Sequence, residues 1–168
     1  MNKVLEKSAK NYLSKLSKLL SNNDLECKYY KWLSDESRVV EVSHDLDELY
    51  KNNSIKSMVN KYKLDTKGQC FYNSGKLSTT ILDVKYCEGF ISIGNIPLVE
   101  HSWIRYNGRY YDLTLEPSDI NRDLILVKEF DISEICECQL RLRTWGPYIK
   151  DYFINNVYKN EKEDKANK

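Results

Sequence analysis

The chain has 168 residues, in which 26 Lys and Arg against 25 Asp and Glu give a formal net charge of +1. This length is typical of one compact domain that folds without disulfides or a structural metal. The near-neutral charge argues against a general nucleic-acid-binding protein, and no apolar run approaches the roughly 20 residues that span a bilayer. Because the N-terminus lacks the apolar block of a signal peptide, we expect the five cysteines to be reduced thiols of a cytoplasmic protein.

Residues 3–20 are predicted to form a helix, because apolar residues recur at the three- and four-residue steps of one helical face. The same segment contains five lysines and one glutamate, which makes it a basic amphipathic helix. Such a helix either packs on its own domain with its lysines in water or docks a partner. Residues 24–58 are acidic instead, with eight carboxylates against five basic side chains. They are predicted to contain a short strand over 39–42 and a helix from about Asp45 towards Tyr62, capped by Ser43 or Asp45.

The middle of the chain predicts one helix followed by an antiparallel hairpin. The helix begins at Cys70, and its apolar residues continue at helical spacing to Leu82. The strands that follow are rich in aromatic and β-branched residues and are expected at 86–93, 98–106 and 109–115. Asn107-Gly108 between the last two strands is a strong signal for a two-residue turn. A helix packed on an antiparallel sheet defines an α+β fold.

The C-terminal third gives weaker signals. Residues 120–130 fit both a helix and a strand, 135–142 are predicted to be a strand, and 148–158 are predicted to be a helix. The last ten residues are almost all polar and are expected to form a disordered tail. No repeat or linker divides residues 1–158, so we expect a single domain. Its parts would be a helical N-terminal region to residue 63, a core over 64–117 and a C-terminal part over 118–158.

Cys70, His101 and Asp112 stand in an order suited to nucleophilic catalysis. A thiol at a helix N-terminus is favoured as thiolate by the helix dipole. A nearby imidazole can take its proton and later return it, and a carboxylate can orient that imidazole. Each residue alone is more often structural: a buried thiol, a strand histidine or a solvated aspartate.

Counting from the Asn107-Gly108 turn supports the pairing of His101 with Asp112. With Tyr106 opposite Arg109, His101 lies opposite Thr114 and Asp112 lies opposite Trp103. His101 and Asp112 are then diagonal neighbours on one face of the hairpin, which is within reach of a hydrogen bond between their side chains.

These motifs resemble the transglutaminase-like branch of the papain-like cysteine enzymes. The resemblance covers roughly residues 67–117 and rests on Gly68-Gln69-Cys70, Glu100-His101-Ser102-Trp103 and Tyr111-Asp112-Leu113-Thr114, with the strand at 86–89 between them. Phe71 follows the cysteine where the family often has Trp. The resemblance implies Cys70 as nucleophile, His101 as general base and acid, and Asp112 as the residue that orients His101.

Two further residues are assigned to oxyanion and substrate binding. Gln69 and the backbone N–H of Cys70 are candidate donors to an oxyanion. Trp103 is placed in the same group, although shielding of the His101–Asp112 pair or packing in the core explains it equally well.

Other residues compete for chemical roles. Cys87 is a rival nucleophile, but its apolar strand context would raise its pKa, and His44 is the only other candidate base. Cys136 and Cys138 could join a thiolate metal site with Cys27 or Cys87, but they lack the usual knuckle spacing. In a strand they would share one face as core residues, so no metal and no cofactor are expected.

The sequence therefore predicts a cysteine-dependent acyl-transfer enzyme acting on an amide through a thioester, by hydrolysis, deamidation or transamidation. Its expected partner is a protein or peptide substrate. The alternative is a non-catalytic module that keeps the fold and binds a protein through the basic first helix or a tyrosine-rich surface. The Lys-, Asn-, Ile- and Tyr-rich composition fits a small effector of a phage or mobile element.

Overall fold

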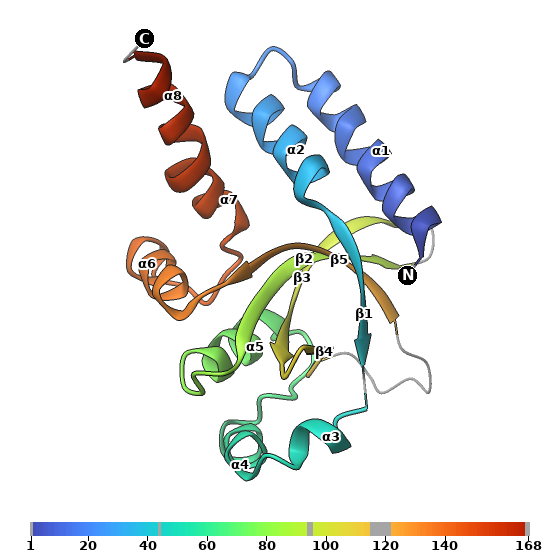
Figure 1. Cartoon of the computed structure of the whole chain (residues 1–168), viewed down its shortest axis with the longest axis vertical. Coiled ribbons are helices and arrows are strands. Elements are labelled where there is room, and N and C mark those ends of the chain that lie inside the picture. The colour runs from blue at the N-terminus through green and yellow to red at the C-terminus, as the bar shows by residue number, and fades with distance from the viewer. Residues whose placement is uncertain (1, 44, 94–95, 115–121, 167–168) are drawn as a thin grey trace.

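The computed structural model describes residues 2–43, 45–93, 96–114 and 122–166. Helices and strands mix in an α+β fold around a small barrel (Figure 1). The strands are β1 (Arg38–Ser43), β2 (Lys85–Ile93), β3 (Ile96–Tyr106), β4 (Arg109–Tyr111) and β5 (Arg122–Phe130). The longer helices are α1 (Lys3–Leu19), α2 (Asp24–Glu36), α4 (Asn53–Tyr62), α5 (Cys70–Ser78), α6 (Ile132–Leu142) and α8 (Lys159–Ala166). The shorter ones are α3 (Asp47–Tyr50), α7 (Ile149–Tyr152) and a π-helical segment, η1 (Phe153–Tyr158).

The five strands close into a barrel in the order β1-β4-β3-β2-β5. Strand β1 closes it by pairing antiparallel with β5 on one edge and parallel with β4 on the other. The sheet was predicted to be antiparallel, so the parallel β1–β4 pair differs from the expectation, and the closure of the barrel was not predicted. Barrel closure leaves a sheet without free edges, and one buried cluster draws on four of the strands. That cluster consists of Val40, Val42, Cys87, Ile91, Trp103, Leu124 and Leu126.

The β3–β4 hairpin has the register expected from its turn. Tyr106 pairs with Arg109, Arg105 with Tyr110 and Ile104 with Tyr111. Asn107 and Gly108 both have positive φ, 48° and 79°, as a type I′ turn requires. Strand β4 ends at Tyr111, earlier than expected. The next backbone N–H, that of Asp112, donates to the Ser43 carbonyl of β1 at 3.2 Å.

Two groups of helices cover opposite sides of the barrel. In Figure 1, α1, α2 and the α7–α8 segment lie on one side of the strands, and α3, α4 and α5 lie on the other. The first helix follows the prediction closely, but α2 was not predicted. The Asn23 side chain caps α2 by accepting from the Glu26 N–H at 3.2 Å.

The helix expected between Asp45 and Tyr62 is split into α3 and α4. Asp45 does take part at its start, since its carboxylate accepts from the Asp47 N–H at 3.0 Å. The break falls at Asn52, whose side chain caps α4. His44 lies outside the described residues.

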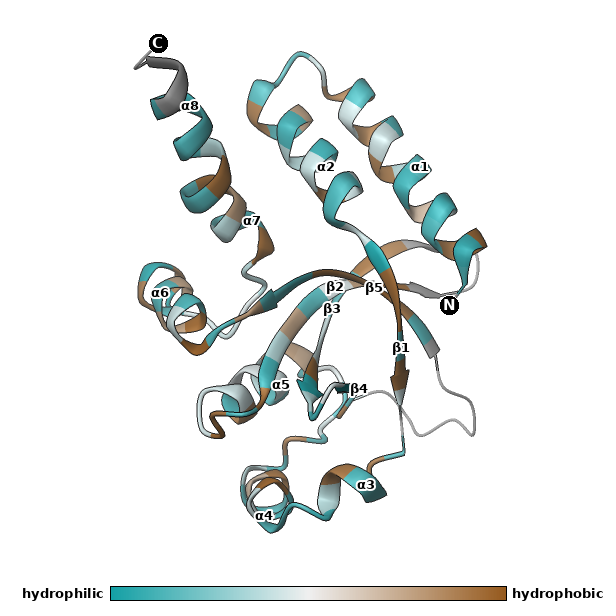
Figure 2. Cartoon of the chain, in the orientation of Figure 1, coloured by the Kyte–Doolittle hydropathy of each residue, from teal (hydrophilic) through white to brown (hydrophobic). Residues whose placement is uncertain are grey.

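The C-terminal part departs most from the sequence prediction. The strand expected over 135–142 is wrong, because this segment is the helix α6, which begins with a capping box between Asp131 and Glu134. The helix expected over 148–158 is confirmed as α7 and η1. Where a disordered tail was predicted, the helix continues as α8, and Figure 2 shows it as hydrophilic over nearly its whole length. Polar composition alone does not prevent a helix that extends an already formed one.

Candidate active site

Cys70 is the first residue of helix α5, which packs on β3 and β2. Gly68, at a positive φ of 75°, turns the chain just before the helix begins. The Cys70 side chain is half-buried. The first backbone N–H groups of a helix have no intrahelical partner and form the positive end of its dipole, so the start of α5 favours a negative charge on the thiol.

His101 and Asp112 form a direct hydrogen bond. His101 Nε2 lies 2.6 Å from Asp112 Oδ2, and both side chains are buried. The second carboxylate oxygen of Asp112 accepts from the Thr114 N–H at 2.8 Å and from the Thr114 hydroxyl at 2.9 Å. These bonds fix the carboxylate, and the carboxylate in turn fixes the plane of the imidazole. The hydrogen bond expected between these two side chains is thus present, although β4 ends at Tyr111, before the pairs expected for residues 112 and 114.

Cys70 and the same imidazole shift each other's pKa. Burial by itself would raise the pKa of the Cys70 thiol, but a hydrogen bond to His101 and the charge of that ring outweigh it and lower this pKa. For His101, burial acts to lower the pKa, and the hydrogen bonds to Asp112 and Cys70 overcome it and raise the pKa to about 9. Asp112 occupies Nε2, so Nδ1 is the ring nitrogen available to Cys70. Both shifts favour a thiolate–imidazolium pair.

Gln69 and Trp103, assigned to substrate or oxyanion binding, occupy different environments. Gln69 is exposed at the N-cap of α5, and its side chain makes no capping hydrogen bond within the described part of the chain. Trp103 is fully buried and stacks on His101 with ring centroids 6.1 Å apart. Trp103 therefore supports the imidazole from the core and does not line a substrate surface, which corrects its assignment to substrate binding.

The remaining thiols lie apart from this constellation. Cys87 is buried in the barrel core, where burial raises its pKa well above the ordinary value. Because α6 is a helix, Cys136 is exposed while Cys138 is buried, so they do not share a face as expected. Burial also raises the pKa of Cys138, to about 12. Over the described ranges, no group of three or more His, Cys, Asp and Glu side chains is placed to hold a metal ion.

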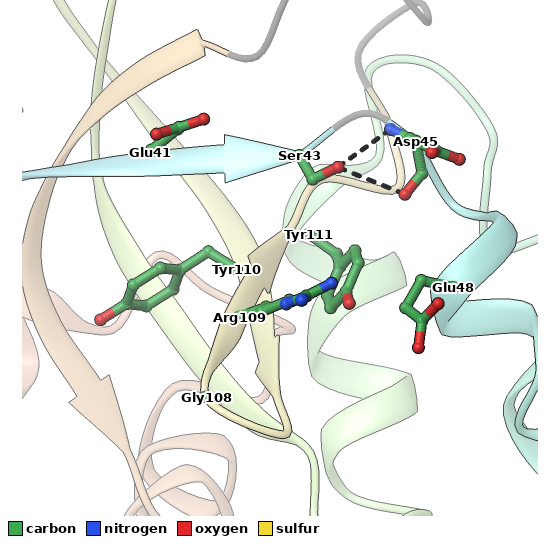
Figure 3. A pocket seen from close by; sticks show the side chains of 8 residues that line it. All are labelled: Glu41, Ser43, Asp45, Glu48, Gly108, Arg109, Tyr110 and Tyr111. Carbon is green, nitrogen blue, oxygen red and sulfur yellow. Dashed lines mark hydrogen bonds between the residues drawn. The ribbon is translucent and has the colours of Figure 1, made fainter.

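A surface hollow of about 360 Å³ lies next to β1 and β4 (Figure 3). Its lining is formed by Glu41, Ser43, Asp45, Glu48, Gly108, Arg109, Tyr110 and Tyr111. The Ser43 hydroxyl bonds with the backbone of Asp45 at its rim. The hollow reaches Tyr111, one residue before Asp112, and is separate from the Cys70–His101–Asp112 constellation.

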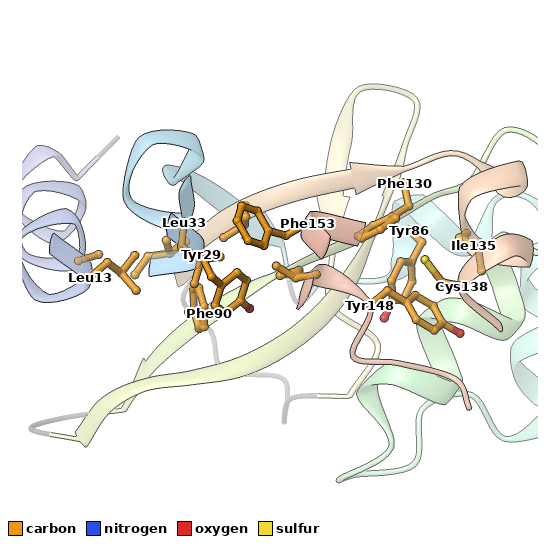
Figure 4. Close-up of a cluster of buried hydrophobic side chains, with 14 of the residues drawn as sticks. Leu13, Tyr29, Leu33, Tyr86, Phe90, Phe130, Ile135, Cys138, Tyr148 and Phe153 are labelled. Atoms are coloured by element: carbon orange, nitrogen blue, oxygen red, sulfur yellow. The ribbon is translucent and has the colours of Figure 1, made fainter. Parts of the chain in front are cut away.

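Sequence reasoning missed a buried polar cluster behind Cys70. Glu88 on β2 is fully buried and accepts hydrogen bonds from the Tyr86 hydroxyl, from the Tyr148 N–H at 2.8 Å and from the Ile149 N–H at 2.9 Å. Burial raises the pKa of Glu88 to about 7. Tyr86 and Tyr148 lie together in the hydrophobic cluster of Figure 4, with ring centroids 5.5 Å apart. The available signal was a lone carboxylate within an otherwise apolar strand.

Comparison of the chain with family models, with curated proteins and with solved structures finds no match. Within the described residues, none of the helices has the length and apolar content needed to cross a membrane.

Proposed function

We propose that this protein is a cysteine-dependent acyl-transfer enzyme of the transglutaminase-like, papain-related type. The observation that carries the proposal is the linked contact of Cys70 with His101 and of His101 with Asp112, which lowers the thiol pKa and raises the imidazole pKa. Cys70 is the first residue of a helix that packs on the strand of His101, as the resemblance in the sequence implies. The proposed substrate is an amide of a protein or peptide.

In the proposed reaction, the Cys70 thiolate attacks the amide carbonyl carbon. The tetrahedral oxyanion is held by the N–H groups at the start of α5, with Gln69 as a further donor. The C–N bond then breaks, and His101 gives its proton to the departing amine, which leaves a thioester on Cys70. Water or a second amine attacks the thioester, His101 takes the proton of this nucleophile, and the thiolate is released. Water gives hydrolysis or deamidation, and an amine gives transamidation.

The first test is thiol alkylation as a function of pH, with each modified cysteine identified by peptide mapping. We expect Cys70 to react at pH values well below about 8.5, the ordinary pKa of a free cysteine. Cys136, which is exposed on α6, provides an internal reference thiol in the same sample. His101→Ala should move the Cys70 profile up towards the ordinary range, because it removes the partner that lowers the Cys70 pKa.

The second measurement is mass-spectrometric trapping of an acyl group on Cys70 after incubation with activated amides or esters of peptides. Cys70→Ala must abolish the adduct. A Cys70 profile that coincides with that of Cys136, or that is unchanged in His101→Ala, contradicts the proposal. The non-catalytic module would then take its place, with the exposed lysines of α1 as the surface to examine first.

A further inference from the structure

Ser102 is placed between the nucleophile and the buried cluster on β2. It follows His101 on β3 and pairs with Glu88 across the β2–β3 ladder. The residue is fully buried, and its hydroxyl has no hydrogen-bond partner of standard geometry among the described residues. A buried hydroxyl without a partner costs about 1–3 kcal/mol, so its presence at this position calls for a physical explanation.

Ser102 lies on the strand against which the helix of Cys70 packs, and it pairs with Glu88, to which Tyr86 donates. The Cys70 thiol and the Tyr86 hydroxyl are therefore its two polar neighbours. One is the Cys70 sulfur, whose anionic form is favoured by both the backbone N–H and the hydroxyl of Ser102. The other is the hydroxyl of Tyr86, whose pKa Ser102 acts to lower. Tyr86 donates its own proton to Glu88, so only its oxygen lone pairs face Ser102.

We propose that Ser102 is a fourth residue of the Cys70 site, whose hydroxyl donates a hydrogen bond to the Cys70 thiolate. This inference rests on the proposed role of Cys70 as nucleophile. A neutral thiol is a weak acceptor, whereas a thiolate is a charged one, so the bond from the hydroxyl strengthens when Cys70 loses its proton. The same bond forms again when the thioester breaks and the thiolate leaves.

The charged and titratable groups around Cys70 divide into two sets. His101 contacts the thiol directly and is held by Asp112. Tyr86 and Glu88 reach it from β2 only through Ser102. Tyr86 therefore competes with Cys70 for the one proton of the Ser102 hydroxyl. This competition predicts that removal of the Ser102 hydroxyl and removal of the Tyr86 hydroxyl act in opposite directions on the Cys70 pKa.

The experiment compares the apparent pKa of Cys70, from alkylation rate against pH, in four variants and the wild type. Ser102→Ala keeps the backbone N–H but removes the hydroxyl, and we expect the Cys70 pKa to rise by about one unit, which lowers the thiolate fraction about tenfold at pH values well below this pKa. Tyr86→Phe should leave the Cys70 pKa unchanged or lower it, because Ser102 then has a single acceptor. Ser78→Ala removes a different buried hydroxyl without a partner, at the far end of the helix that begins at Cys70. It should leave the Cys70 profile within twofold of wild type.

Rescue by Ser102→Thr, which restores a hydroxyl at the same position, separates donation from packing: a pKa close to that of wild type supports the proposal. The proposal is overturned if Ser102→Ala leaves the Cys70 pKa unchanged. It is also overturned if Ser102→Ala and Tyr86→Phe raise this pKa to the same extent, as general loosening of the site would do. Failure of the proposed function has a different outcome, in which Cys70 of the wild-type protein reacts no differently from Cys136.

Discussion

At the scale of single residues, the Asp112 carboxylate orients the His101 imidazole and places a negative charge beside it. One oxygen holds His101 Nε2, and the other is fixed by two donors from Thr114. Burial by itself would raise the pKa of Asp112, but the bonds from His101 and Thr114 lower it, so the carboxylate is charged at neutral pH. A buried negative charge next to the imidazole is what favours imidazolium and, through it, the Cys70 thiolate.

Replacement of Asp112 by Asn tests this charge while keeping the shape of the side chain. We expect the pKa of His101 to fall, because the charge that raises it is removed. The pKa of Cys70 should then rise towards the ordinary value of about 8.5, and each unit of rise lowers the thiolate fraction about tenfold at pH values well below the pKa. Alkylation of Cys70 against pH measures the shift. Asp83→Asn, at an exposed position, is the matched control, and equal profiles for the two variants would contradict the assigned role of Asp112.

The polar residues of the site could be found from the sequence only in part. Cys70, His101 and Asp112 were predicted because a helix start and a two-residue turn are local signals that fix which side chains share a face. Ser102 and Glu88 were not predicted, because their roles depend on what lies behind the strand. Trp103 was assigned to substrate binding, with shielding of the His101–Asp112 pair and packing in the core left as alternatives. Its complete burial favours these alternatives and follows from barrel closure, which the pattern of one strand does not reveal.

At the scale of secondary-structure elements, Asn52 joins two of them. Its side-chain oxygen caps α4 by accepting from the Ser54 N–H at 3.0 Å and the Ile55 N–H at 3.2 Å. Its amide nitrogen donates to the Tyr106 hydroxyl at 2.8 Å, beside the β3–β4 turn. One side chain thus starts a helix and ties it to the hairpin that carries His101.

Asn52→Ala is expected to reduce the free energy of unfolding by about 1–2 kcal/mol, the usual cost of removing a helix cap. Asn52→Asp keeps the capping oxygen but loses the donor to Tyr106, so its loss should be smaller. Denaturant unfolding followed by tryptophan fluorescence gives both values. Asn53→Ala, at the exposed first residue of α4, is the control, and a loss equal to that of Asn52→Ala would show that capping is not the cause.

At the scale of the whole molecule, Glu88 connects the barrel with the C-terminal helices. It accepts from backbone N–H groups of residues 148 and 149, about sixty positions along the chain. A hydrophobic cluster extends the same connection from α1 and α2 across β2 and β5 to α6, α7 and η1 (Figure 4). The described N- and C-terminal helices are therefore held to one side of the barrel by a shared core.

The burial of Glu88 predicts a pH dependence of stability. In the unfolded chain Glu88 loses its proton near pH 4.5, whereas in the folded protein burial raises its pKa to about 7. The folded state therefore binds more protons between these values, and the free energy of unfolding should fall as the pH rises from about 4.5 to about 7. The loss due to this group is of the order of 2–3 kcal/mol, at about 1.4 kcal/mol for each pKa unit.

Urea unfolding at pH 5 and pH 7, in wild type and in Glu88→Gln, isolates this contribution. Gln does not titrate, so the variant should lose less stability over this range than the wild type, whatever its absolute stability. Equal changes in the two proteins would show that Glu88 does not gain its proton within this window. Glu129→Gln, which replaces a carboxylate whose pKa is lowered instead, serves as the control for a pH effect specific to Glu88.

The sequence by itself determined the features that depend on neighbouring residues: the amphipathic first helix, the helix that begins at Cys70, and the register of the hairpin that sets His101 beside Asp112. Hydrogen bonding within a helix or turn extends over only a few residues, so composition and spacing are enough to specify it. Only the tertiary structure decided that β1 closes a barrel with β4 and β5, that Trp103 supports His101 from the core, and that Ser102 and Glu88 are buried opposite each other in the β2–β3 ladder. These contacts join segments far apart in the chain, and they form because burial of apolar faces selects which segments meet.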